Sequence, residues 1–302
     1  MNVPAAFLGT TPYVAYAYSY PHKTSYRSLD PTRPLRDVWQ NENQQSLFLY
    51  LHVPFCEFRC GFCNLFTFAN PSGDWMKRYV AQVRCEAEQV RQAIPDATFS
   101  RLAIGGGTPT FLEVNELAAL LQVATGIMGA QPKRIPVSIE ASPATATSEK
   151  LSLLREFGVD RLSLGVQTFD EDDSRKIGRP QRTSDVERTI AEVRSARFPV
   201  LNLDLIYGGE GQTMPAWLDS VKAAIAYQPE EIYLYPLYIR ELTGLGNKPH
   251  SWPDQRLSMF PDVPTIRETG YPQLEQLKPL ERPTTSPGRA LQLWIWRSSV
   301  GD

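Results

Sequence analysis

From residue 46 onward, short apolar runs rich in β-forming residues alternate with longer segments whose apolar residues recur at helical spacing. The short runs predict strands at 46–53, 99–106, 135–142, 161–168, 200–208 and 231–238. The longer segments predict helices at 75–94, 113–128, 148–157, 184–196 and 214–227. Alternation of this kind is typical of a parallel sheet covered by helices. The chain is therefore predicted to be α/β, either a partial (β/α) barrel or a doubly wound sheet, which periodicity alone does not separate.

Polar and glycine residues stand where several of these predicted strands end. The groups that share this position are a cysteine-rich loop, the run GGGTPT at 105–110, Glu140 with Ser142, Gln167, and Asp204. Because the carboxyl ends of parallel strands meet at one edge, we expect the chemistry to gather there. One buried carboxylate could be a paired core residue, but several polar groups at the same end favour a shared pocket.

The glycine run at 105–107 has two interpretations. Glycine permits positive φ and lets a ligand approach the backbone closely, and Thr108 adds a hydroxyl group. An ordinary tight turn from strand to helix would explain the run as well. The segment lacks the GxxxxGK[ST] pattern of a phosphate loop.

Cys56, Cys60 and Cys63 follow the first predicted strand, separated by three residues and then by two. Three thiolates from one loop can bind a [4Fe–4S] cluster and leave one iron without a protein ligand. Zinc would need a fourth ligand, and a disulfide would leave an odd thiol. The cluster is favoured over zinc, and zinc over a disulfide. Cys85 lies in a helical run and is predicted to be a buried structural thiol.

The composition is that of an ordinary globular protein, with 302 residues, 42% hydrophobic and 21% charged. A formal net charge of -2 implies no general attraction to nucleic acid or to an anionic membrane. No run approaches the ~18 apolar residues of a membrane span. The first residues have no basic start and no apolar core, so they do not resemble a signal peptide. We expect a cytoplasmic protein, in which clustered thiols stay reduced.

The segment CEFRCGFC resembles the CxxxCxxC motif of the radical S-adenosylmethionine (SAM) superfamily, with aromatic Phe62 before the last cysteine. The segments YLHVPFC, GGGTPT, SIEASP, SLGVQTF and NLDLIYG follow in order between residues 50 and 208. Together they resemble the oxygen-independent coproporphyrinogen III oxidase family, which includes HemW-like haem chaperones. The resemblance implies a partial (β/α)6 barrel of the radical SAM type.

The resemblance also implies cofactors and roles for particular residues. The open iron of the cluster would bind SAM, whose reductive cleavage gives a 5′-deoxyadenosyl radical that abstracts hydrogen from a substrate. Positions that match SAM contacts of the family are Tyr50, Phe62, Gly106, Gly107, Thr108, Glu140, Gln167, Arg179 and Asp204. Judged alone, Arg179 in RKIGRPQR would be assigned to a solvated basic turn. One SAM is expected, or two as in coproporphyrinogen oxidase itself.

The same resemblance implies a small-molecule substrate, a porphyrinogen or another compound, and an electron donor such as flavodoxin or ferredoxin. It leaves two functions open. The first is a radical SAM oxidoreductase, and the second is a HemW-like protein that binds and delivers haem without oxidase activity. A structural zinc protein is a weaker third, because it leaves the series Glu140, Gln167 and Asp204 unexplained.

The flanks lead to separate expectations. We divide the chain into an N-terminal extension at 1–45, a radical SAM core at 46–240 and an irregular segment at 241–302. The tyrosine-rich run YAYSYPHKTSYR would cap the pocket or pack as an extended segment over the barrel. Frequent prolines between 249 and 287 argue against a packed domain there. Family-like pattern is lost after RETGY, so we expect the tail from about residue 270 to be truncated or frame-shifted.

Overall fold

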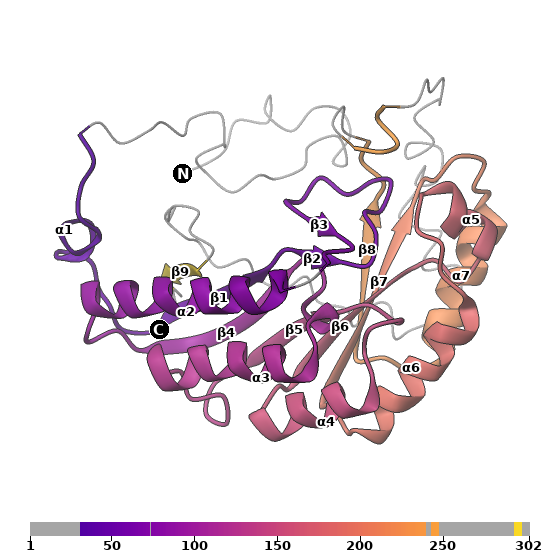
Figure 1. Ribbon diagram of the computed structural model, residues 1–302. Coiled ribbons are helices and arrows are strands. Elements are labelled where there is room, and N and C mark those ends of the chain that lie inside the picture. The colour runs from indigo at the N-terminus through magenta and orange to yellow at the C-terminus, as the bar shows by residue number, and fades with distance from the viewer. Residues whose placement is uncertain (1–30, 73, 240–242, 248–292, 298–302) are drawn as a thin grey trace, which may run out of the picture.

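The computed structural model describes residues 31–72, 74–239 and 243–247, together with the backbone of 293–297 (Figure 1). The main strands are β1 (Leu47–Val53), β4 (Phe99–Gly106), β5 (Val137–Ala141), β6 (Arg161–Gln167), β7 (Val200–Tyr207) and β8 (Glu231–Pro236). The helices that connect them are α2 (Trp75–Ala93), α3 (Val114–Gln122), α4 (Ser148–Phe157), α6 (Thr183–Ser195) and α7 (Met214–Ala226). The predicted alternation of strands and helices is confirmed.

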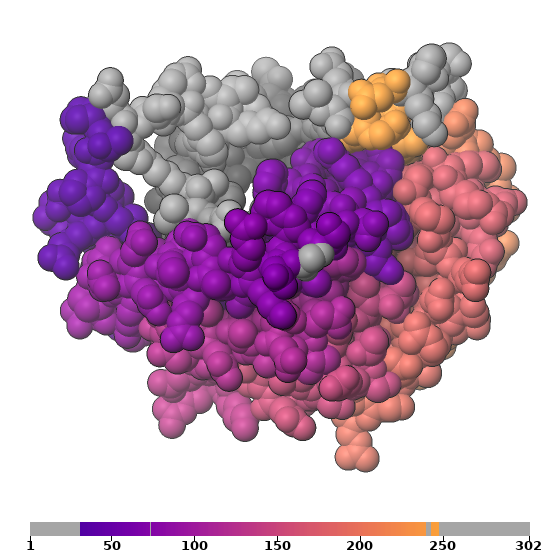
Figure 2. Space-filling model, viewed as in Figure 1, coloured from indigo at the N-terminus to yellow at the C-terminus, as the bar shows by residue number. Residues whose placement is uncertain are grey.

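The order of the strands separates the two folds that the sequence left open. In the described residues the sheet runs β8-β7-β6-β5-β4-β1-β9, where β9 is Leu293–Arg297. Every neighbouring pair from β8 to β1 is parallel, and β9 is antiparallel to β1. Strands that follow one another in chain order, joined by right-handed crossovers, place all their helices on one face. Figure 1 shows α2, α3, α4, α6 and α7 on the outer face of a curved sheet, and Figure 2 shows their side chains covering it. The fold is an open (β/α) barrel, and it is not doubly wound.

The two faces of the sheet have different chemistry. Along β1 the residues Leu47, Leu49 and Leu51 are fully buried and belong to one apolar core shared with the helices. Alternate positions on β5 and β7 face the opposite side, and these include Glu140 and Asp204. Side chains alternate along a strand. The polar inner face therefore follows from the same two-residue period that builds the core.

Local signals in the sequence set the ends of several helices. Thr147 accepts a hydrogen bond from the Lys150 amide at the start of α4, and Gly158 ends that helix with a left-handed φ of 108°. Thr213 caps α7 in the same way through the Ala216 amide. Side-chain caps satisfy amide groups that have no partner inside the helix. These caps fix where α4 and α7 begin and where α4 ends.

Several elements have no counterpart in the prediction. They are the short helices α1 (Leu35–Trp39) and α5 (Glu171–Lys176), the small parallel pair β2 (Phe55–Cys56) and β3 (Phe68–Ala69), and β9 (Leu293–Arg297). Each is too short to show a reliable hydrophobic period. The backbone of β9 pairs antiparallel with β1, although we expected residues 241–302 to be irregular.

The other predictions for the flanks lie outside the described residues. This applies to the tyrosine-rich run, to the proline-rich part of the tail, and to truncation or a frame shift. In the described part of the chain, none of the helices has the length and apolar character needed to cross a membrane.

Candidate functional site

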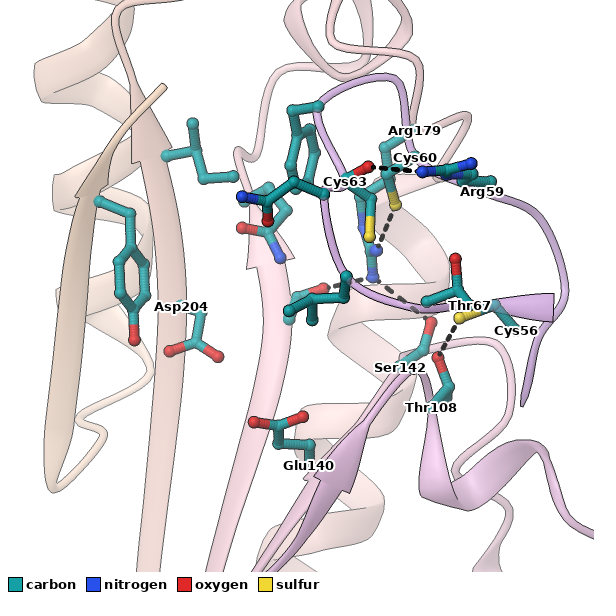
Figure 3. Close-up of a pocket in the computed structure, with 18 of the residues that line it drawn as sticks. Cys56, Arg59, Cys60, Cys63, Thr67, Thr108, Glu140, Ser142, Arg179 and Asp204 are labelled. Atoms are coloured by element: carbon teal, nitrogen blue, oxygen red, sulfur yellow. Dashed lines mark hydrogen bonds between the residues drawn. The ribbon is translucent and has the colours of Figure 1, made fainter. Parts of the chain in front are cut away.

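A cavity of about 480 Å³ opens at the carboxyl ends of the strands, where a shared pocket was predicted from the sequence. Its walls come from the cysteine loop and from the ends of β4, β5, β6, β7 and β8 (Figure 3). The predicted residues that line it are Cys56, Cys60, Cys63, Phe62, Gly106, Gly107, Thr108, Glu140, Gln167, Arg179 and Asp204. The fold thus brings together side chains that are up to 148 positions apart in the sequence, from Cys56 to Asp204.

Two local structures hold the cysteine loop. Cys56 ends β2, and its carbonyl accepts a hydrogen bond of 2.8 Å from the Asn70 amide on the β3 side. The Cys63 amide donates to the Cys60 carbonyl at 3.1 Å, which closes a tight turn. In Figure 3, Cys60 and Cys63 project from this turn and Cys56 projects from the neighbouring strand. All three thiols therefore face one cavity.

The glycine run packs directly against the cysteine loop. Gly107 and Thr108 donate amide hydrogen bonds to the carbonyls of Val53 and Phe55, at 2.7 and 2.8 Å. A Cβ on Gly107 would lie 2.7 Å from the Phe55 oxygen and 2.8 Å from the Cys56 sulfur. The structure therefore gives this glycine a role besides ligand approach, because no larger residue fits between the two loops.

Gly106 is constrained by its other neighbour. Its φ is 119°, a conformation that residues other than glycine rarely adopt, and a Cβ there would lie 2.5 Å from the His52 ring. Its amide donates to Oε2 of Glu140 at 2.9 Å. Gly106 therefore orients a carboxylate of the cavity through its backbone.

Arg179 is buried, with 9% of the residue exposed, so the solvated basic turn that its local sequence suggests does not hold. Its Nη2 group donates to the Gly165 carbonyl at 2.7 Å and to the Ser142 hydroxyl at 3.4 Å. Its Nη1 group donates to the Cys60 sulfur at 3.2 Å (Figure 3). The arginine thus links the ends of β5 and β6 to the cysteine loop.

Glu140 and Asp204 form the acidic wall of the cavity, away from the cysteines in Figure 3. Glu140 is accessible from the cavity but otherwise surrounded by protein, and this desolvation raises its pKa to about 7, against the opposing hydrogen bond from Gly106. Burial also raises the pKa of Asp204, although Ser163 and Asn202 donate to its two oxygens at 2.9 and 2.8 Å. These carboxylates can accept hydrogen bonds from hydroxyl groups of a ligand.

Gln167 and Tyr50 differ from each other in their relation to the cavity. Gln167 has a φ of 69° at an irregularity in the pairing of β6 with β7, and such a bulge re-aims a side chain at the end of a strand. Tyr50 does not line the cavity. Its hydroxyl lies behind Gly105, where a Cβ would be 3.0 Å from it and 2.9 Å from the Glu140 carboxylate. Tyr50 therefore lies beside the glycine run near Glu140, and a SAM contact by Tyr50 stays a prediction.

The donor set fits a [4Fe–4S] cluster better than a single metal ion. In the described ranges, no three His, Cys, Asp or Glu side chains are arranged to hold one ion. In a [4Fe–4S] cluster each cysteine binds its own iron, so the three sulfurs need not converge on one point. Burial raises the pKa of the Cys56 thiol to about 11, and it also raises the pKa of Cys63. Metal binding must therefore displace protons from these thiols.

The prediction for Cys85 is wrong. This thiol is exposed on α2, where Val83, Ala87 and Val90 form the buried stripe. Cys85 falls outside that stripe because its position has the wrong phase in the helical repeat. A free surface thiol on a neighbouring helix does not belong to the cysteine site.

Sequence analysis missed several residues that build the site. Ser163 and Asn202 hold Asp204, while Gly61 and Gly178 pack the cysteine loop against the turn before Arg179. For Ser163 and Asn202 there was a signal, since each is a polar residue inside an apolar strand. For the two glycines there was none, because their contact joins residues far apart in the chain.

Residues 50–224 match the sequence model of the Radical SAM superfamily. Because the match covers more than half of the 302 residues, the chain belongs to this superfamily. The resemblance inferred from the cysteine motif is therefore confirmed.

Two curated relatives are named for the two functions that the sequence left open. The heme chaperone HemW of Bacillus subtilis is 32% identical over 201 residues, which are 66% of this chain and 52% of the relative. The oxygen-independent coproporphyrinogen III oxidase of Cereibacter sphaeroides is 30% identical over 275 residues, which are 84% of this chain and 59% of the relative. The chain thus spans a little over half the length of these relatives.

Among solved structures, the fold is similar to that of coproporphyrinogen III oxidase (HemN) from Escherichia coli. The TM-score is 0.74 at 24% sequence identity, and the match covers 84% of this chain and 59% of the other. At this identity the likeness shows a shared fold, the radical SAM barrel.

Proposed function

We propose that this chain is a radical SAM oxidoreductase of the coproporphyrinogen III oxidase type. Cys56, Cys60 and Cys63 would bind a [4Fe–4S] cluster, and SAM would lie between that cluster and the acidic wall. One observation carries the proposal: three thiols from one loop face the same cavity as the carboxylates of Glu140 and Asp204. When bound, the two cofactors supply one-electron cleavage of SAM and a 5′-deoxyadenosyl radical that abstracts hydrogen.

The residues of the chain would have separate tasks. Glu140 would accept hydrogen bonds from the ribose hydroxyls, with its orientation fixed by the Gly106 amide. Gly107 would let the glycine run lie close against Cys56, and Gln167 would point into the cavity from its bulge. The apolar wall from β8 and the following loop, with Tyr235, would face the substrate.

The substrate would be a porphyrinogen or another small molecule, and the electron donor a flavodoxin or ferredoxin. The second candidate is delivery of haem without oxidase activity, which the similarity to heme chaperone HemW favours. Cleavage of SAM to 5′-deoxyadenosine by the reduced protein supports the first candidate. Stoichiometric binding of haemin without any cleavage of SAM supports the second.

The cluster is tested by anaerobic reconstitution followed by analysis of iron and sulfide. We expect about four irons per chain in the wild-type protein. Cys60→Ala removes one ligand and should abolish both the cluster absorption and most of the iron. The matched control is Cys85→Ala, which removes an exposed thiol outside the cavity and should retain full iron content. A full cluster in Cys60→Ala would contradict the assignment of the ligands.

A further inference from the structure

Two of the three cysteine sulfurs receive a hydrogen bond from a side chain on another strand end. The Thr108 hydroxyl, after β4, lies 3.6 Å from the Cys56 sulfur. The Arg179 guanidinium, after β6, lies 3.2 Å from the Cys60 sulfur. Figure 3 shows both contacts in the same cavity. The sequence and the family resemblance assigned both residues to SAM and gave them no role toward the cysteines.

Each donor follows a glycine that lets two backbones meet. Gly107 precedes Thr108, and its missing side chain admits Cys56. Gly178 precedes Arg179 and has a φ of 69°, and a Cβ there would lie 2.7 Å from the Gly61 nitrogen. The Gly61 amide donates to the Gly178 carbonyl at 3.3 Å. In both places a glycine allows close contact between two backbone segments, and the next residue donates a hydrogen bond to a cysteine sulfur.

The Arg179 side chain is held by several hydrogen bonds within the protein. Its Nε group donates to Gln181 at 3.3 Å, and its Nη2 group donates to the Gly165 carbonyl and the Ser142 hydroxyl. With one Nη1 hydrogen directed at Cys60, these contacts leave one of the five N–H groups for other partners within the described residues. A forked pair with a carboxylate needs two parallel N–H groups. The observed geometry therefore suits a donor to sulfur better than a forked ligand of SAM.

We propose that Arg179 and Thr108 set the reduction potential of the cluster by donating hydrogen bonds to Cys60 and Cys56. This inference rests on the proposed function, because it requires the cluster. Reduction adds one electron, supplied by dithionite in the experiment below, and makes the cluster and its thiolates more negative. Hydrogen bonds to the sulfurs are among the factors that set cluster potentials. Both donors stabilise the reduced form, and the positive charge of Arg179 gives it the larger effect.

The experiment is a potentiometric titration of the reconstituted full-length protein with dithionite, followed by electron paramagnetic resonance without SAM. At a fixed potential, Arg179→Gln should lower the ratio of reduced to oxidised cluster about tenfold, which is ~59 mV for a one-electron couple. Thr108→Val should lower the ratio less, and Thr108→Ser should retain the wild-type value because it keeps the hydroxyl. Arg179→Lys keeps the charge without the fork and should give an intermediate value.

Arg182→Gln is the matched control, since Arg182 is exposed at the start of α6 and the substitution makes the same change of charge. It should keep the wild-type potential. A wild-type potential in Arg179→Gln and Thr108→Val, with only the affinity for SAM reduced, would overturn the inference and leave the proposed function standing. Wild-type protein that takes up no cluster would overturn both.

Discussion

The Glu140 carboxylate combines access from the cavity with protein on its other sides. Its pKa of about 7 is raised first by desolvation, and the nearby Asp204 raises it further. In an unfolded chain the same group would titrate at its ordinary value of 4.5. Between these two values the folded state binds more protons than the unfolded state, so the contribution of Glu140 to stability falls as the pH rises. Above neutral pH the ionised Glu140 carboxylate therefore lowers the stability of the folded state.

Glu140→Gln should raise the free energy of unfolding at pH 8, relative to wild type, more than it does at pH 5. The reason is that glutamine keeps the acceptor for the Gly106 amide but carries no charge. Urea unfolding of the cluster-free protein at both pH values measures the difference. Glu42→Gln makes the same substitution at an exposed position and serves as the control. The same difference at both pH values would mean that Glu140 is ionised throughout.

At the scale of elements, the cysteine loop is held by contacts to loops that are distant in sequence. The Leu245 amide donates to the Gly61 carbonyl at 2.7 Å, and Gly178 also packs against Gly61. The Gly107 contact fixes the beginning of the loop at Cys56. The position of the three thiols therefore depends on glycines in two other βα connections.

Gly178→Ala should lower the free energy of unfolding by about 1–2 kcal/mol from the left-handed backbone alone. The Cβ contact with Gly61 adds to this cost and moves Cys60, so the reconstituted variant should also hold less iron. Urea unfolding and iron analysis measure the two effects.

Gly126→Ala is the matched control for this substitution. Gly126 lies in the π-helical turn Val123–Ile127, where a Cβ meets nothing within 4 Å. Alanine is favoured over glycine in helices by about 1 kcal/mol, so this variant should be slightly more stable than wild type. Equal effects of the two substitutions would mean that the contact of Gly178 with Gly61 does not hold the loop.

At the scale of the whole molecule, one ligand would contact the ends of most strands in the sheet. The cavity is lined from the cysteine loop beyond β1, and also from β4, β5, β6, β7 and β8. In the described residues no pairing joins β8 to β1, so the barrel is open. A bound ligand would therefore connect parts of the sheet that the backbone does not.

SAM should stabilise the cluster-loaded protein against thermal unfolding. At a SAM concentration 100 times its dissociation constant, linkage gives about 2.7 kcal/mol. For a domain of this size that corresponds to a rise in Tm of roughly 5–10 °C. Anaerobic differential scanning calorimetry measures it, with cluster-free protein as the control, which should show a smaller rise. An unchanged Tm for the loaded protein would argue that SAM does not bind in the cavity.

The sequence by itself determined the strands, the helices and the cysteine motif. Burial repeats every two residues in a strand and about every 3.6 in a helix, and this local period is visible along the chain. The cysteines stand in one loop, so their spacing alone indicated a shared centre. Glu140, Gln167 and Asp204 were found because parallel strands align their carboxyl ends at one edge.

Only the tertiary structure decided which of these elements meet. Strand order separated the open barrel from the doubly wound sheet, and packing turned Arg179 from an apparent surface residue into a buried partner of Cys60. It also placed Cys85 on the surface and brought Gly61 against Gly178. Each of these outcomes depends on residues far apart in the chain. The local hydrophobic pattern indicates whether a residue is buried. The residue that it packs against depends on the packing of the whole molecule.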